Sequence, residues 1–203
     1  MRSLQSVEAR PPFIENRVLF RMRLFTAIDL SEEVRRNLER LLERLRPTAR
    51  LRWSRPENLH VTTKFIGEWP EARLDELKRA LAAIPRPGAI PIAVRGLGWF
   101  PNARAPRVFW AGIEAGSGLA ELARQTELST SRLGVPEEGR PYSPHLTLAR
   151  VPPVTPLGAL EKAIADLGAP DFGGFTALRF HLYLSELSPA GSRYTRLADF
   201  PLE

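Results

Sequence analysis

The chain has 203 residues, of which 43% are hydrophobic and 26% are charged, a balance typical of a globular protein. It contains no cysteine, which excludes disulfides and thiolate metal sites, and its three histidines leave little room for a histidine-rich metal site. No apolar run reaches the roughly 18 to 20 residues that cross a bilayer. We therefore expect a cytoplasmic protein with no membrane partner, no metal and no cofactor.

The formal net charge of +6 raises the question of a nucleic-acid partner. Residues 1–23 hold five arginines and two glutamates, so the rest of the chain carries a net charge of only +3. Lysine occurs only three times, and the arginines that dominate the basic set offer a planar fork suited to phosphate. A compositional bias of the source genome would explain the same arginine content, so charge alone is a weak argument for RNA.

Residues 1–21 show no hydrophobic periodicity and contain a Pro-Pro step, which predicts a flexible N-terminal extension before a single bilobal domain over 22–203. Ser31 is a good N-cap for a helix that runs to Arg46 and ends at Pro47. Hydrophobic spacing and Gly/Pro punctuation predict these elements in chain order: a strand at 24–30, the helix after Ser31, a short strand at 51–53, a strand at 60–66 broken by Gly67, a helix from Pro70 to about Ile84, a linker at 85–91, strands at 92–97 and 108–113, a helix at 117–133 stopped by Gly134, a strand at 145–151, a helix ending near Leu167, and a hairpin of strands at 178–187 and up to Phe200.

These strands and helices alternate, but without the regular rhythm of a doubly wound parallel sheet. Each half of the chain supplies strands, helices and one copy of a short histidine motif. The pattern predicts an α+β fold of two pseudo-symmetric lobes that face each other across a central cleft.

The motif consists of Arg-Pro, three residues and His-x-Thr, and it occurs at residues 55–62 and again at 140–147. It contains two of the three histidines, the side chains whose unperturbed pKa lies nearest neutral pH. Because side chains i and i+2 of a strand share a face, His60 and Thr62 project together, and so do His145 and Thr147. Placing the two strands near each other would bring two imidazoles and two hydroxyls to one site.

Such a site suits in-line displacement at phosphorus without a metal. One imidazole deprotonates a nucleophile and the other protonates a leaving group, each role being worth roughly 10²–10⁴-fold in rate. The two hydroxyls donate to non-bridging phosphoryl oxygens. A lone His-x-Thr is more often a half-buried structural histidine, but two copies in the same frame favour function. Neither a Gly-x-Ser-x-Gly elbow nor a phosphate-binding P-loop is present.

With these motifs the sequence resembles the 2H phosphoesterase superfamily, and within it the bacterial and archaeal RNA 2′,3′-cyclic phosphodiesterases also called 2′-5′ RNA ligases. The resemblance runs from about Met22 to Phe200, and Thr63 departs from it where leucine is more usual. The matching segments are Met22-Arg23-Leu24-Phe25-Thr26-Ala27-Ile28, residues 53–67, residues 140–150 and residues 185–194. The fold it implies has an antiparallel or mixed sheet in each lobe, with helices on the outer faces.

The resemblance implies hydrolysis of RNA 2′,3′-cyclic phosphate ends to 2′-phosphomonoesters. It makes His60 the general acid toward the leaving 3′-oxygen and His145 the general base that activates water, while Thr62 and Thr147 hold the phosphoryl oxygens. The near symmetry of the motifs leaves the acid and base assignment open on the residues alone. A reversible 2′-5′ RNA ligase acting on tRNA half-molecules and a non-catalytic RNA-binding module are the alternatives. The expected partner is RNA with a 2′,3′-cyclic phosphate end, and tRNA fragments are one candidate. Nothing in the sequence demands an oligomer, so we expect a monomer.

Four further residues are candidate substrate-binding residues: Phe25, Lys64, Tyr142 and Arg150. Phe25 and Tyr142, like Trp53, could stack on a base or pack in the core. By strand parity, Lys64 lies on the face of His60 and Thr62 and could reach the mouth of the cleft. The same parity directs Arg150 away from His145, so a salt bridge is as plausible there as a phosphate contact.

Two other features fall outside the repeated motif. His181 has no threonine two positions on and no Arg-Pro before it, so we expect a structural or surface role. The loop at 101–107 carries Arg104 and Arg107 and is either a guide for the RNA strand or a simple polar connection.

Overall fold

The computed structural model describes residues 20–188 and 191–203, so the extension expected over 1–21 lies almost wholly outside the described residues. Nine strands and four α-helices are present in the described part of the chain. In chain order they are β1 (Arg21–Asp29), α1 (Glu32–Leu45), β2 (Arg52–Trp53), β3 (His60–Pro70), α2 (Leu74–Ala82), β4 (Ile90–Phe100), β5 (Val108–Ala115), α3 (Ser117–Ser131), β6 (His145–Arg150), α4 (Gly158–Ala165), β7 (Asp171–Ala177), β8 (Arg179–Ser188) and β9 (Gly191–Pro201).

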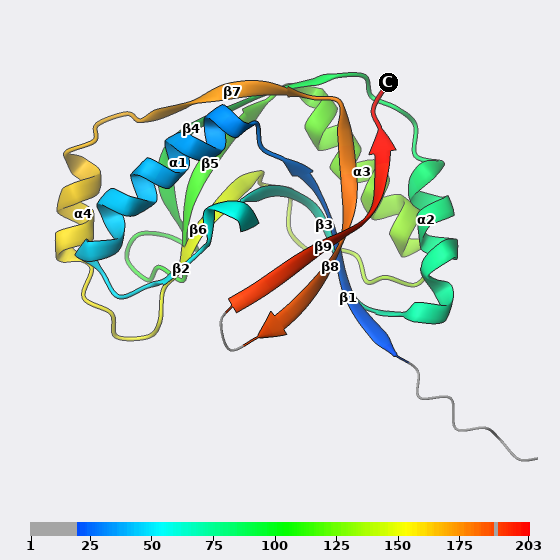
Figure 1. Cartoon of the computed structure of the whole chain (residues 1–203), viewed down its shortest axis with the longest axis horizontal. Coiled ribbons are helices and arrows are strands. Elements are labelled where there is room, and N and C mark those ends of the chain that lie inside the picture. Colours follow the sequence, from blue (N-terminus) through cyan, green and yellow to red (C-terminus); the bar gives the residue numbers. More distant parts are fainter. Residues whose placement is uncertain (1–19, 189–190) are drawn as a thin grey trace, which may run out of the picture.

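The strands form two sheets, and every strand pair within them is antiparallel (Figure 1). The four-stranded sheet has the order β3-β1-β8-β9, and the five-stranded sheet has the order β2-β6-β5-β4-β7. Apart from β2, the two orders correspond strand by strand, with β3 matching β6 and β1 matching β5. The α+β fold with two pseudo-symmetric lobes is confirmed.

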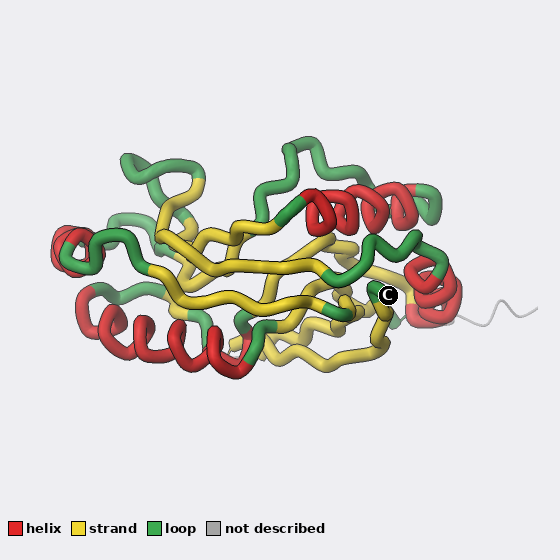
Figure 2. Tube along the Cα trace, turned by 90° about the horizontal axis from the view of Figure 1, so that it is seen from above, coloured by secondary structure: helices red, strands yellow, loops and turns green. Residues whose placement is uncertain are grey.

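The helices cover the outer sides of the lobes and leave the strands between them (Figure 2). Two of the helices pack on the sheet that does not contain the strand before them: α1 follows β1 but contacts β7, and α3 follows β5 but contacts β3. The Asn37 side chain of α1 donates a 2.9 Å hydrogen bond to the Phe172 carbonyl of β7. The lobes are therefore not the two halves of the chain, since each half contributes to both lobes.

Local sequence signals explain the ends of the long helices. Ser31 caps α1, and its hydroxyl accepts a hydrogen bond from the Val34 amide. After α3, Gly134 takes a φ of 93°, and the amides of Gly134 and Val135 bond back to the carbonyls of Ser131 and Thr130. This is the Schellman arrangement that glycine favours, so the expected stop at Gly134 is confirmed.

Two expectations about the strands were wrong. Gly67 does not break the strand that starts at His60, because β3 continues to Pro70. Gly67 instead has a φ of 78° next to a shift in the β1–β3 register, which marks a bulge rather than a chain break. Strand β7 was not expected, because Gly173 and Gly174 weaken the strand pattern of its sequence. A side chain at Gly174 would meet the Ile92 carbonyl oxygen at 2.9 Å, so close packing against β4 explains that glycine.

Candidate active site

Both His-x-Thr segments are the first residues of a strand, and both are followed at once by a β-bulge. In the β1–β3 register Thr26 faces Lys64 and Ala27 faces Thr62, so Thr63 is the extra residue. In the β5–β6 register Phe109 faces Ala149 and Trp110 faces Thr147, so Leu148 is the extra residue. The motifs are thus equivalent in backbone geometry as well as in sequence.

The two imidazoles are held in the same way. The Nδ1 atom of His60 lies 2.8 Å from the carbonyl oxygen of Asn58, and Nδ1 of His145 lies 2.8 Å from that of Ser143. A carbonyl oxygen only accepts, so each Nδ1 carries a hydrogen and donates it. In the neutral ring this leaves Nε2 unprotonated and able to exchange a proton with a ligand.

All four motif side chains line one cleft of about 890 Å³ between the lobes. His60 and Thr62 come from β3, and His145 and Thr147 come from β6. Besides burial, His145 adds to the lowering of the pKa of His60, as expected of two imidazoles on one cleft. The convergence expected from strand parity is therefore present in the structure.

Two reciprocal hydrogen bonds join the motifs across the cleft. The Ser54 hydroxyl, just before the first Arg-Pro step, donates to the Thr147 carbonyl at 2.6 Å. The Tyr142 hydroxyl, just after the second Arg-Pro step, donates to the Thr62 carbonyl at 3.0 Å. Each motif loop thus contacts the main chain of the other motif's threonine, which fixes the two strands relative to one another.

An aromatic ring supports each imidazole. Phe25 of β1 is buried and stacks on His60 with the ring centroids 4.7 Å apart. Tyr194 of β9 meets the His60 ring edge-on at 5.3 Å. On the other side, Phe100 at the end of β4 meets His145 edge-on at 4.8 Å. Phe25 therefore acts on the site through His60, while most of its own surface is covered.

A polar network lies beside His60. Asp29 is the β1 partner of His60 in the sheet register; its carboxylate pairs with Arg196 and accepts a 2.7 Å hydrogen bond from the Tyr183 hydroxyl. Burial lowers the pKa of His60 to about 4, although the Asn58 carbonyl and the Asp29 carboxylate act to raise it. The imidazole is therefore held mainly neutral at pH 7.

The parity argument was wrong for the residues after each bulge. Lys64 lies on the back of the sheet, where its ammonium group is buried and contacts the Glu127 carboxylate at 2.7 Å and the Pro136 carbonyl at 2.9 Å. Arg150 instead lines the cleft with His145 and Thr147. One extra residue moves every later side chain to the opposite face, so both assignments were inverted for the same reason.

The other residues singled out from the sequence fall into place around this site. Tyr142 contacts Thr62 through its hydroxyl, and burial raises its pKa. Trp53 borders the cleft, but its indole N–H donates to the Ala49 carbonyl at 3.1 Å and its ring packs edge-on against Phe109. His181 is buried rather than at the surface, with Nδ1 at 2.6 Å from the Asp199 carboxylate.

Thr63, where the resemblance leads us to expect leucine, lies on the buried face of β3. Its hydroxyl lies 2.7 Å from that of Thr26 on β1, and both side chains are buried. Each hydroxyl can donate or accept, so the two threonines meet each other's need for a hydrogen-bond partner inside the core. The change is therefore a local substitution behind the site.

Sequence reasoning missed several residues around the two histidines and the cleft: Asp29, Phe65, Phe100, Tyr183, Tyr194 and Arg196. Phe65 follows the Thr63 bulge, faces the cleft and is 57% exposed. Tyr194 belongs to the C-terminal stretch that matched the family, which was the one available signal. The others become neighbours of His60 or His145 only through sheet pairing, which no local pattern reveals.

The described residues contain neither a cluster of metal ligands nor a membrane-spanning helix. Within residues 20–188 and 191–203, no group of three or more His, Cys, Asp or Glu side chains is placed to hold a metal ion. No helix in the same residues is long and apolar enough to cross a membrane.

Comparisons with known proteins agree with this geometry. The family model described as LigT like Phosphoesterase matches residues 28–110 and 113–194, so each matched segment contains one His-x-Thr motif. Two curated relatives are both named RNA 2′,3′-cyclic phosphodiesterase. The one from Methanothermobacter thermautotrophicus is 35% identical and the alignment covers 90% of this chain and 100% of the relative; the one from Thermus thermophilus is 36% identical, with 89% and 90% covered.

Solved structures show the same fold. A Thermus thermophilus protein superposes with a TM-score of 0.74 at 33% identity, covering 89% of this chain and 98% of that one. Escherichia coli LigT in complex with 3′-AMP also gives a TM-score of 0.74, at 27% identity, covering 90% of this chain and 98% of that one. The family model matches two segments that together cover most of the chain, and each brings one motif to the same cleft, so the chain belongs to the LigT-like phosphoesterase family.

Proposed function

We propose that this protein hydrolyses the terminal 2′,3′-cyclic phosphate of RNA to a 2′-phosphomonoester, with His60 and His145 as the acid–base pair. One observation carries the proposal: both Nδ1 atoms donate to a main-chain carbonyl, which leaves both Nε2 atoms for one shared cleft. The curated relatives with this named activity, which match about nine tenths of the chain, support the choice of substrate.

In the proposed reaction, Nε2 of His145 takes a proton from a water molecule as its oxygen attacks phosphorus. The bond from phosphorus to the 3′-oxygen breaks, and Nε2 of His60 gives its proton to that oxygen. The products are a 3′-hydroxyl and a 2′-phosphomonoester. His145 then gives its proton to solvent, and His60 takes one from solvent, which restores the starting state. The hydroxyls of Thr62 and Thr147 donate to the non-bridging oxygens, where charge develops.

The low pKa of His60 sets a condition on this assignment. An acid must carry its proton, whereas His60 without ligand is mainly neutral at pH 7. The cyclic phosphate is an anion, and an anion next to an imidazole favours its protonated form. Substrate binding therefore prepares the acid by raising its pKa, and Arg150 on the cleft wall is placed to contact the same anion.

The proposal also includes a monomer acting in the cytoplasm, since a single chain supplies both motifs to the cleft. An oligoribonucleotide with a 2′,3′-cyclic phosphate end, incubated in EDTA, tests the reaction. We expect a product heavier by one water and sensitive to phosphatase, and losses of about 10²–10⁴-fold in kcat for His60→Ala and for His145→Ala. Full activity in either variant, or no hydrolysis by the unaltered protein, would refute the proposal.

A further inference from the structure

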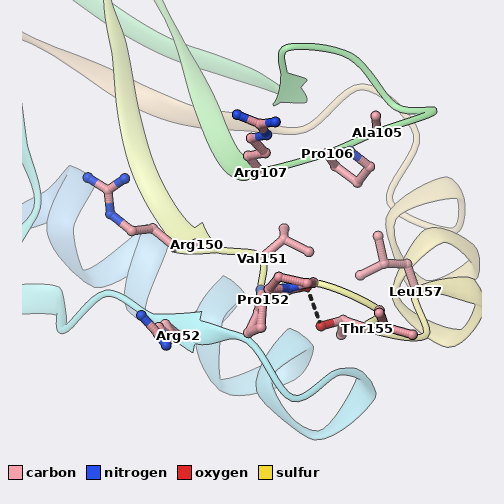
Figure 3. Close-up of a pocket in the computed structure, with 11 residues that line it drawn as sticks. Arg52, Ala105, Pro106, Arg107, Arg150, Val151, Pro152, Thr155 and Leu157 are labelled. Atoms are coloured by element: carbon pink, nitrogen blue, oxygen red, sulfur yellow. Dashed lines mark hydrogen bonds between the residues drawn. The ribbon is translucent and has the colours of Figure 1, made fainter.

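A second hollow of about 660 Å³ lies beside the active-site cleft, at the ends of β2, β5 and β6 (Figure 3). The two cavities share Arg52 and Arg150 in their walls. Arg107, at the end of the 101–107 loop, completes a set of three arginines along one side. We call this cavity the arginine hollow, and its remaining lining is Ala105, Pro106, Val151, Pro152, Pro153, Val154, Thr155 and Leu157.

Sheet pairing places the three arginines at neighbouring positions of the main chain. Arg52 of β2 lies directly opposite Arg150 of β6, and Arg150 also lies opposite Val108, the residue after Arg107. Like charges at facing positions of an antiparallel pair destabilise a sheet. No acidic residue lines the hollow, so nothing in its walls offsets this repulsion.

These three arginines also lack partners elsewhere. In the described part of the chain, none of the three guanidinium groups makes an ion pair or a hydrogen bond. Arg95, in the same sheet, contacts the carboxylates of both Asp171 and Glu114. A cluster that breaks the local pairing rule without an internal partner is typical of a site for an external anion.

The rest of the lining is apolar. Pro106, Val151, Pro152 and Leu157 surround the hollow opposite the guanidinium groups (Figure 3). Val154 on its wall is fully exposed and has a φ of 59°, a conformation that β-branched residues rarely adopt. An apolar surface beside a row of arginines suits a nucleotide, whose base has apolar faces while its phosphate is charged.

We propose that the arginine hollow binds the nucleotide that precedes the cyclic end of the RNA, with its phosphate on Arg52 and Arg107. This inference rests on the proposed function, because it takes the central cleft as the place of the terminal phosphate. Arg150 lies in the walls of both cavities and spans the two phosphates. The protein then selects oligoribonucleotides over cyclic mononucleotides, because only an oligoribonucleotide reaches the hollow.

The test compares Arg52→Gln and Arg107→Gln with the control variant Arg104→Gln. Arg104 is in the same loop as Arg107, but its side chain does not line the hollow. Hydrolysis of a five-nucleotide RNA with a cyclic end is measured beside hydrolysis of 2′,3′-cyclic AMP. We expect each test variant to raise KM for the RNA about tenfold, the loss of one charge-assisted contact. The kinetics of Arg107→Gln on 2′,3′-cyclic AMP stay unchanged, because Arg107 lines the hollow and not the active-site cleft.

A binding assay separates this inference from the proposed reaction. Fluorescence anisotropy follows the affinity for the same RNA ending in a 2′-phosphate, over a range of salt concentrations. We expect the slope of log K against log salt to fall by about 0.7 for each lost phosphate contact. If the two variants bind this RNA as tightly as Arg104→Gln does, the inference is wrong. It is also wrong if Arg107→Gln weakens the binding of 2′-AMP as much as it weakens the binding of the RNA. Absence of hydrolysis by the unaltered protein refutes the reaction alone, since the binding comparison still decides the subsite.

Discussion

The hydroxyl of Tyr142 donates a 3.0 Å hydrogen bond to the main-chain carbonyl of Thr62, the threonine of the other motif. The Ser54 hydroxyl makes the reciprocal bond to the Thr147 carbonyl. Each bond runs from the loop that precedes one His-x-Thr strand to the His-x-Thr strand of the other motif. The distance between the two halves of the active site is thus set by a matched pair of contacts.

Removing either bond is expected to weaken both stability and turnover. Tyr142→Phe and Ser54→Ala should each lower the free energy of unfolding by about 1 kcal/mol, the usual net value of one hydrogen bond. Because the Tyr142 hydroxyl positions Thr62, Tyr142→Phe should lower kcat while KM stays close to its original value. Thermal unfolding and steady-state kinetics on 2′,3′-cyclic AMP measure both effects. A raised KM with normal kcat would instead place the Tyr142 hydroxyl on the substrate.

Lys64 is expected to matter for folding and not for catalysis. Its ammonium group is buried against Glu127, so Lys64→Met should lower the free energy of unfolding by about 1–3 kcal/mol because it leaves that carboxylate without its cation. Urea unfolding measures this loss, and kcat of the folded variant should remain near that of the original protein. A change in KM for RNA at unchanged stability would contradict the position of Lys64 behind the sheet.

The depressed pKa of His60 predicts how stability depends on pH. The unfolded chain binds a proton at this histidine with a pKa near 6.5 and the folded chain with a pKa of about 4, so the unfolded state holds more protons between these values. The free energy of unfolding therefore falls as pH drops from about 6.5 to 4. His60 accounts for about 3 kcal/mol of this loss at most, and His60→Asn should abolish that contribution. Urea unfolding at pH 7, 5.5 and 4 checks the prediction; parallel curves for both proteins would refute it.

The carboxylate of Asp29 raises the pKa of His60, so Asp29→Asn should lower that pKa further. The substitution retains a side-chain oxygen that can accept the hydrogen bond from Tyr183. NMR titration of the His60 ring protons measures the shift. Asp171→Asn, which removes a carboxylate paired with Arg95 instead, is the control and should leave His60 unchanged.

Ligand binding should move the same pKa in the opposite direction. Saturation with 2′-AMP places a phosphate anion in the cleft and should raise the pKa of His60, as the acid role requires. The NMR titration is repeated with 2′-AMP and with adenosine, which lacks the anion. An unchanged His60 pKa with 2′-AMP would assign the proton donor to another group.

Much of the site could be predicted from the sequence, because strand alternation is reliable over the two steps from His60 to Thr62 and from His145 to Thr147. It failed one residue later, at Thr63 and Leu148, where each strand contains a bulge. A bulge depends on pairing with a neighbouring strand, and no local pattern of β3 or β6 reveals it.

The supporting residues escaped prediction for a related reason. Asp29 and Phe100 reach the imidazoles because β1 pairs with β3 and because β4 ends beside His145. These are relations between strands far apart in the sequence. Helix ends such as Ser31 and Gly134 were predicted because their signals are local.

The exchange of helices between the lobes has a consequence for assembly and motion. Strand β1 at the start of the domain pairs with β8 near its end, while α1 covers the sheet that holds β7. Neither lobe can complete its core before nearly the whole chain is available, so folding depends on contacts of long range in sequence. A chain cut between β4 and β5 leaves two fragments that each lack part of both sheets. The same interleaving opposes hinge opening, so a substrate meets a cleft whose width is already fixed when the chain has folded.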